Sequence, residues 1–195
     1  MSDLSHPQVD TASPLEHADA AVADVLVPHE GQGLVRAIGA MSDLTDQEPM
    51  YAASGATIAV GLLMRDERTL RAGTRMLAAH LLATALRGVV KQLVDRTRPV
   101  AAAERGQYEL GSGKRFESDF NSFPSGHTAG ALAAARALGR HYPGSNHAWS
   151  GLAVAASVAQ VIRSKHYVSD VVAGAAIGLI AEEAVHRILC RAERI

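Results

Sequence analysis

Apolar residues are concentrated in long stretches of this 195-residue chain, and the two-residue alternation typical of β-strands is absent from them. Ala and Gly occupy many of these positions, which would let neighbouring helices approach closely. The pattern predicts five long helices, at Met50–Met64, Thr69–Leu93, Ser125–Arg140, His147–Arg163 and Ser169–Arg191. The expected fold class is therefore all-α, a helix bundle of five to six helices.

The first 41 residues differ from the rest of the chain. Residues 1–16 are polar and contain Pro7 and Pro14, which is typical of a loosely held tail. Residues 17–27 predict a short amphipathic helix that Pro28 ends, and residues 34–41 are weakly helical. We therefore divide the chain into an N-terminal tail with a short amphipathic helix, residues 1–41, and a helical domain, residues 42–195.

Composition and charge exclude some classes of protein and leave the membrane question open. The formal net charge of −1 gives no electrostatic reason to expect a nucleic acid partner. The single cysteine, Cys190, cannot form an internal disulfide. The N-terminus shows no obvious signal peptide, and no uninterrupted apolar run reaches the ~18 residues that mark a membrane span.

Three polar stretches carry the candidate chemistry. The first is Lys91–Pro99, with the sequence KQLVDRTRP at a predicted helix C-terminus. The second is Pro124–His127, with the sequence PSGH, where a helix begins and its unpaired backbone N–H groups would attract a phosphate. The third is His166–Asp170, with His and Asp four residues apart. Taken alone, each stretch could be purely structural. The cations of the first would complement a helix C-terminus, and the second would be an ordinary helix N-cap followed by a surface histidine.

Alternating helix directions would bring these three stretches to one end of the bundle. Two histidines, an aspartate, a lysine, an arginine and a helix N-terminus would then form a site for acid–base chemistry on an anion. The opposite end would collect basic residues, which resembles the cytoplasmic face of a membrane protein. These residues are Arg65, Arg68, Arg71, Arg75, Arg136, Arg140, Arg187, Arg191 and Arg194.

Together the three stretches resemble the motifs of the type 2 phosphatidic acid phosphatase (PAP2) superfamily, K-x6-RP, PSGH and SR-x5-H-x3-D. The first two match in full, and His166 and Asp170 match the end of the third. The resemblance covers about residues 42–186. It implies an acid phosphatase–haloperoxidase-like helical bundle, membrane-embedded, with residues 42–195 as the catalytic domain.

The resemblance also implies a role for each matching residue. His166 would be the nucleophile that forms a phosphohistidine, Asp170 would hold its other ring nitrogen, and His127 would be the general acid. The phosphate would be held by Lys91, Arg98, Ser125 and Gly126. The scheme needs no cofactor and no metal. We interpret Glu182, Glu183 and His186 as a solvated helix face and not as metal ligands.

One position departs from the family pattern. Gln160 stands where the third motif has its arginine, and it lacks both the charge and the guanidinium fork. We expect Gln160 to remain near the phosphate. Arg163 follows about one helical turn later, and it would either take over the missing role or complement a helix C-terminus.

The leading interpretation is a phosphatase of a membrane lipid phosphate or pyrophosphate. It would lie in the bacterial inner membrane with its active site on the non-cytoplasmic side. The alternatives are a soluble non-specific acid phosphatase of the same family, or a non-catalytic phospholipid-binding member that Gln160 has disabled. The sequence does not define the lipid headgroup or the oligomeric state.

Overall fold

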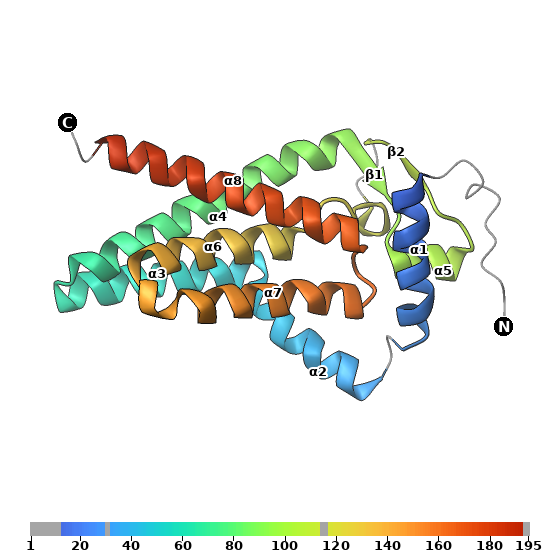
Figure 1. Ribbon diagram of the computed structural model, residues 1–195, viewed down its shortest axis with the longest axis horizontal. Coiled ribbons are helices and arrows are strands. Elements are labelled where there is room, and N and C mark those ends of the chain that lie inside the picture. The colour runs from blue at the N-terminus through green and yellow to red at the C-terminus, as the bar shows by residue number, and fades with distance from the viewer. Residues whose placement is uncertain (1–12, 30–31, 114–116, 193–195) are drawn as a thin grey trace.

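Five long helices form the body of the protein and run alternately in opposite directions (Figure 1). The computed structural model describes residues 13–29, 32–113 and 117–192. The five predicted helices are confirmed, and their observed ends lie within three residues of the expected ones. They are α3 (Gln47–Met64), α4 (Glu67–Leu93), α6 (Gly126–His141), α7 (Asn146–Ile162) and α8 (Val168–Ala192).

Shorter elements gather where α4 ends and α8 begins (Figure 1). The helices among them are α1 (Pro14–Leu26), α2 (Gly33–Ser42) and α5 (Pro99–Arg105). Strand β1 (Val94–Arg96) pairs antiparallel with β2 (Leu110–Ser112), a ladder that the sequence pattern did not predict because three residues are too few to show alternation. Single 3-10 turns cover Val27–His29, Asp43–Thr45, Ser118–Phe120 and Pro143–Ser145.

Helix α6 lies at the centre and packs against α4, α7 and α8. Alanines make many of its contacts, and Ala79, Ala133 and Ala181 are fully buried. Two glycines of α8 allow an especially close approach, because a Cβ at Gly174 would lie 2.4 Å from the carbonyl oxygen of Ser125. A Cβ at Gly178 would likewise be too close to the carbonyl oxygen of Ala129 on α6. The start of α8 is therefore fixed beside the start of α6.

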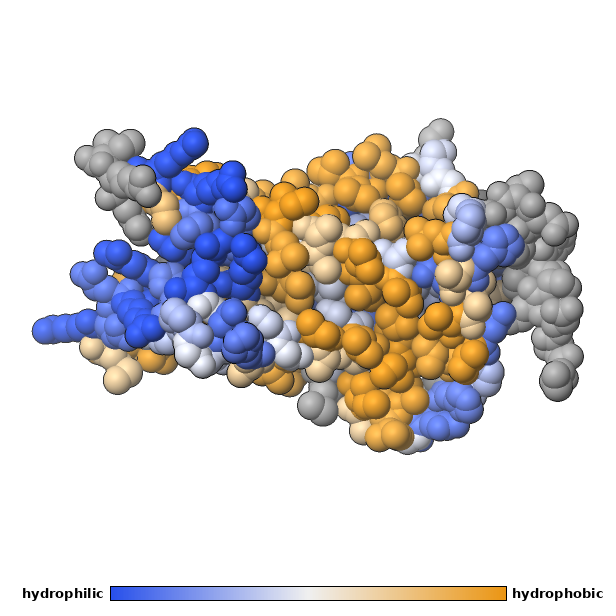
Figure 2. Space-filling view, in the orientation of Figure 1, coloured by the Kyte–Doolittle hydropathy of each residue, from blue (hydrophilic) through white to orange (hydrophobic). Residues whose placement is uncertain are grey.

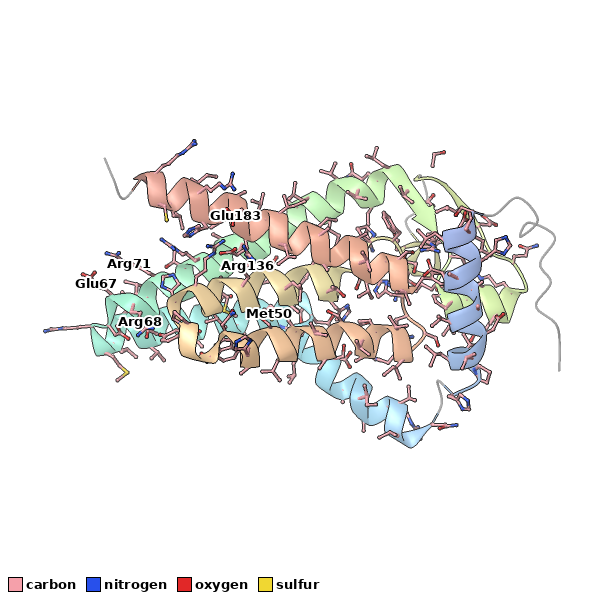
Figure 3. The ribbon with its side chains drawn as sticks, viewed as in Figure 1. Met50, Glu67, Arg68, Arg71, Arg136 and Glu183 are labelled. Carbon is pink, nitrogen blue, oxygen red and sulfur yellow. The ribbon has the colours of Figure 1, made fainter. Side chains whose placement is uncertain are left out.

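The basic end forms where α4 begins and α6 and α8 finish, as Arg68, Arg71 and Arg136 show in Figure 3. Arg194 lies outside the described residues. The expectation of a solvated face at Glu182 is wrong. Its side chain is buried, and it accepts hydrogen bonds from Arg136 (2.8 Å) and Arg140 (2.6 Å). These ion pairs fasten the end of α6 to α8.

At the opposite end, α1 packs across the start of α8. Its first turn closes a capping box, in which the Ser13 hydroxyl accepts from the Glu16 N–H and the Glu16 carboxylate accepts from the Ser13 N–H. Helix α2 packs against α7. The N-terminal helices therefore contact the bundle at the end that holds the three motif stretches.

A broad apolar surface covers the middle of the molecule (Figure 2). Large apolar side chains are also exposed on α4, α7 and α8, among them Leu86, Val158 and Ile180. For the ranges that the structure describes, none of the helices combines the length and the apolar character that crossing a membrane requires.

Candidate active site

His166 lies in the loop between α7 and α8, with a side chain that is 2% exposed. Its Nδ1 is 2.7 Å from the carbonyl oxygen of Ser122. A carbonyl oxygen can only accept a hydrogen bond, so Nδ1 carries the proton and Nε2 keeps the lone pair that a nucleophile needs. Burial lowers the pKa of His166; Asp170 opposes this shift, and the positive charge of Arg98 adds to it. The imidazole is therefore neutral at neutral pH.

Asp170 acts on His166 through Ser122. The resemblance implies that Asp170 holds the second ring nitrogen, but its Oδ2 lies 3.8 Å from Nδ1 of His166, beyond hydrogen-bond distance. This oxygen accepts instead from the Ser122 hydroxyl (2.5 Å) and from the Tyr167 N–H (2.8 Å). The carboxylate thus fixes Ser122, and the Ser122 carbonyl group orients the imidazole.

A buried arginine holds Asp170 in place. Arg96 donates from Nη1 to Asp170 (2.7 Å) and from Nη2 to Asp19 on α1 (2.9 Å). All three side chains are at most 4% exposed. Asp19 also accepts from the backbone N–H of Ser169 (3.1 Å). Sequence reasoning missed both Arg96 and Asp19. Arg96 occupies a spacer position of the first motif, and nothing near Asp19 in the sequence marks it.

The start of α6 supplies the second part of the site. Ser125 is the N-cap, and its buried hydroxyl accepts from Thr128 (3.1 Å) and can still donate its own proton. The helix begins at Gly126, so the first N–H groups of α6 have no partner within the helix. His127 follows, and its ring centroid lies 6.5 Å from that of His166. Both predicted histidines therefore lie beside the helix N-terminus.

A cavity of about 610 Å³ lies beside His127. Asp46 and Glu48 line one part of it, and Arg87, Gly126 and His127 line another. Nε2 of His127 pairs directly with the Asp46 carboxylate, and both residues line this cavity. The cavity thus brings a histidine, carboxylates and a guanidinium together at the start of α6.

Three cations lie within electrostatic range of one another, and one of them, Arg87, lines this cavity. Lys91 and Arg98 come from the first motif, and each feels the positive charge of the other or of Arg87. Arg98 is oriented by its Nε, which donates to the carbonyl oxygen of Ser118 (2.9 Å). Arg87 belongs to no motif, and its only sequence signal is a place one turn before Lys91. Such a cluster favours a bound anion.

The N-terminal segment engages both residues considered for the missing arginine, Gln160 on α7 and Arg163 directly after this helix. Gln160 is 1% exposed, and its Nε2 donates to the Ser42 hydroxyl (2.5 Å). Nη1 of Arg163 donates to the carbonyl oxygen of Gly39 (3.2 Å) and to the carboxylate of Asp43 (2.5 Å). Both side chains are therefore anchored to α2 and to the turn that follows it.

Asp43, Asp46 and His127 bring three potential metal-ligand atoms within 4.8 Å of one another. Asp43 already pairs with Arg163, and Asp46 pairs with His127. Both carboxylates are therefore already engaged by protein side chains. The group provides a specific place to look if a divalent cation affects the protein.

Comparison with known proteins identifies the fold and the family. The crystal structure of Aquifex aeolicus LpxE is similar to the structure of this chain, with a TM-score of 0.62 and 15% sequence identity. The similarity covers 92% of this chain and 98% of the LpxE chain. A transmembrane PAP2 type phosphatidylglycerolphosphate phosphatase from Bacillus subtilis gives a TM-score of 0.61 and 20% identity, over 93% of this chain and 89% of its own. At this identity the likeness shows the fold.

Sequence relatives point the same way. A lipid A 1-phosphatase from Porphyromonas gingivalis is 36% identical over 83 residues, which are 40% of this chain. The matched region is 18% of the length of that relative. A sequence model of the PAP2 superfamily matches residues 72–193, which include all three motif stretches. The chain therefore belongs to the PAP2 superfamily.

Proposed function

We propose that the protein is a lipid phosphatase, which hydrolyses a phosphomonoester or pyrophosphate of a membrane lipid through a phosphohistidine intermediate. The observation that carries this proposal is the orientation of His166. Its Nδ1 is fixed on the carbonyl oxygen of Ser122, and His127 and the start of α6 lie beside it. Lys91 and Arg98 supply positive charge for a phosphate at this place.

The geometry supports a two-step transfer. Nε2 of His166 attacks the phosphorus atom, the bond from phosphorus to the lipid oxygen breaks, and His127 gives that oxygen a proton. A water then attacks the phosphorus atom of the phosphohistidine and gives a proton to His127, the bond from phosphorus to Nε2 of His166 breaks, and inorganic phosphate leaves. The cations and the N–H groups of α6 stabilise charge on the phosphoryl oxygens, where each donor contributes about 10²–10³ in rate.

An apolar groove favours a lipid over a small soluble phosphomonoester. It has a volume of about 520 Å³, and Ile38, Leu44, Met50 and Leu152 are among its lining residues. Thr45 lines both this groove and the cavity beside His127. A lipid with its phosphate in the cavity would therefore find the apolar groove beside it for its chain. The names of the relatives, lipid A 1-phosphatase and phosphatidylglycerolphosphate phosphatase, agree with such a substrate.

We propose further that the protein is an integral membrane protein with its active site on the non-cytoplasmic side. The apolar surface of Figure 2 would face lipid. The arginine-rich end, which includes Arg68 and Arg136, would lie in the cytoplasm as basic residues of membrane proteins do. The site at the other end would then open outside.

Phosphate release by the detergent-purified chain tests the function. The substrates are phosphatidate, phosphatidylglycerol phosphate, lipid A, an isoprenyl pyrophosphate and a soluble phosphomonoester. We expect turnover of a lipid substrate that His166→Ala abolishes. The matched control is His147→Ala, a change to an exposed histidine outside the motifs, and it should leave turnover intact. Turnover that survives in His166→Ala would contradict the proposed mechanism.

The second candidate is a phospholipid-binding member without catalysis. The observation in its favour is Gln160, which replaces the arginine of the third motif and points its amide at Ser42. On this reading the folded chain binds the lipid substrates and releases no phosphate from any of them. Preference for the soluble phosphomonoester would instead favour a non-specific acid phosphatase of the family.

A further inference from the structure

The site lacks a guanidinium from α7, where the third motif would supply one. Gln160 is neutral and buried against Ser42. Arg163 is bound to Asp43 and to the carbonyl oxygen of Gly39. A phosphoryl group in the cavity would therefore need its planar, two-pronged donor from another element.

Arg87 of α4 is placed to be that donor. It lines the cavity together with Gly126 and His127, and its side chain is half-buried. Its Nε makes a long hydrogen bond of 3.4 Å to the carbonyl oxygen of Pro124. Within the part of the chain that the structure describes, no carboxylate pairs with it. Its two terminal nitrogens are thus available for an anion.

The placement of Arg87 is unfavourable unless an anion binds there. Lys91 lies four residues later on the same face of α4, and like charges at this spacing repel. Arg98 adds a third positive charge within range of both. A phosphate among the three side chains would remove this repulsion.

Gly126 shows where the guanidinium lies. A Cβ at this position would be 2.5 Å from Nε and 2.6 Å from Cζ of Arg87. Alanine is the better helix former, but here it would occupy the space of the guanidinium. Arg87 therefore rests directly against the first residue of α6, where the unpaired N–H groups attract a phosphate.

We propose that Arg87 binds the substrate phosphate, supplying from α4 the guanidinium that α7 lacks at Gln160. This inference rests on the proposed function for its substrate. The binding of inorganic phosphate tests it separately, because this probe does not require turnover.

The experiment compares Arg87→Gln with the parent chain and with Arg71→Gln. Arg71 lies on the same helix at the far end, exposed and paired with Glu67, and is a matched control. Dissociation constants for inorganic phosphate are measured by calorimetry, and turnover is measured on the preferred lipid. We expect Arg87→Gln to weaken phosphate binding by about 10- to 100-fold and to lower turnover by about 10²–10³. Arg71→Gln should change neither.

Two further variants keep the test decisive if Arg87→Gln does not fold. Arg87→Lys keeps the charge and loses the planar fork. We therefore expect its dissociation constant for phosphate to lie between that of the parent and that of Arg87→Gln. Gly126→Ala keeps the backbone N–H of α6 and displaces the flexible guanidinium. It should weaken phosphate binding, and adding it to Arg87→Gln should cause little further loss, because both changes remove the same contact.

The outcomes separate this inference from the proposed function. Phosphate binding that Arg87→Gln leaves unchanged overturns the inference, even if the parent hydrolyses lipid. Loss of binding in Arg163→Gln in place of Arg87→Gln would assign the missing charge to Arg163 and would also overturn it. A parent that binds phosphate through Arg87 without hydrolysing any lipid supports the inference and refutes the function. A parent that binds no inorganic phosphate refutes the inference, whereas the proposed function stands or falls with the phosphate-release assay.

Discussion

Replacing Asp19 by Asn tests whether α1 supports the catalytic site. Asp19 is 3% exposed and accepts from Arg96 (2.9 Å), from the Ser169 N–H (3.1 Å) and from the Ser169 hydroxyl. An amide of the same size removes the negative charge and turns an N–H group toward these donors. Of its two carboxylate partners among the described residues, Arg96 would then keep Asp170 alone.

The expected cost is large because the pair is buried. Removing one partner of a buried ion pair costs about 3–5 kcal/mol. For a chain of this length 1 kcal/mol corresponds to about 2–4 °C in melting temperature, so Asp19→Asn should lower it by about 6–20 °C. Turnover of the remaining folded protein should also fall, because Arg96 orients Asp170 and, through Ser122, His166, the proposed nucleophile.

The assay is thermal unfolding in detergent, followed by the fluorescence of Trp149, together with phosphate release well below the melting temperature. Asp24→Asn is the control, since Asp24 is an exposed carboxylate on the same helix. The reasoning is refuted if Asp19→Asn melts within about 2 °C of the parent and of this control. Unchanged turnover would refute the link from α1 to the nucleophile.

Two further predictions concern pH and metal. Because burial lowers the pKa of His166 below its ordinary 6.5, the unfolded chain binds more protons than the native chain below that pH. The contribution of His166 to stability should be complete above pH 6.5 and decline below it, by up to about 1.4 kcal/mol per pH unit until the folded-state pKa is reached. Melting temperatures at several pH values should show this decline in the parent and a weaker one in His166→Gln, and equal slopes would count against it. EDTA should leave phosphate release unchanged, whereas a loss that a divalent cation restores would implicate Asp43, Asp46 and His127.

The sequence predicted the long helices well because their signals are local. Apolar stretches and capping residues placed all five long helices, and their alternating directions brought Lys91, His127 and His166 to one end. The family motifs then assigned a role to each of these residues. The features that depend on neighbouring residues, namely the helix positions and the motifs, could thus be predicted from the sequence.

The partners of the motif residues could not be predicted. Arg96 reaches Asp19 across 77 positions, and Gln160 reaches Ser42 across 118. Such contacts depend on how the helices pack, and no sequence pattern around Asp19 or Ser42 indicates them. The burial of Glu182 was missed for the same reason, since its two arginines come from another helix.

The contacts of the N-terminal helices affect which part of this chain could fold on its own. The family match begins at residue 72, inside α4. A fragment cut there would contain every motif residue and would lose the partners that Arg96, His127 and Gln160 find on the N-terminal side. Boundaries drawn from motif content alone would therefore divide one cooperative structure. Without α1, another acidic group would have to take the place of Asp19 beside Arg96, the arginine that also pairs with Asp170.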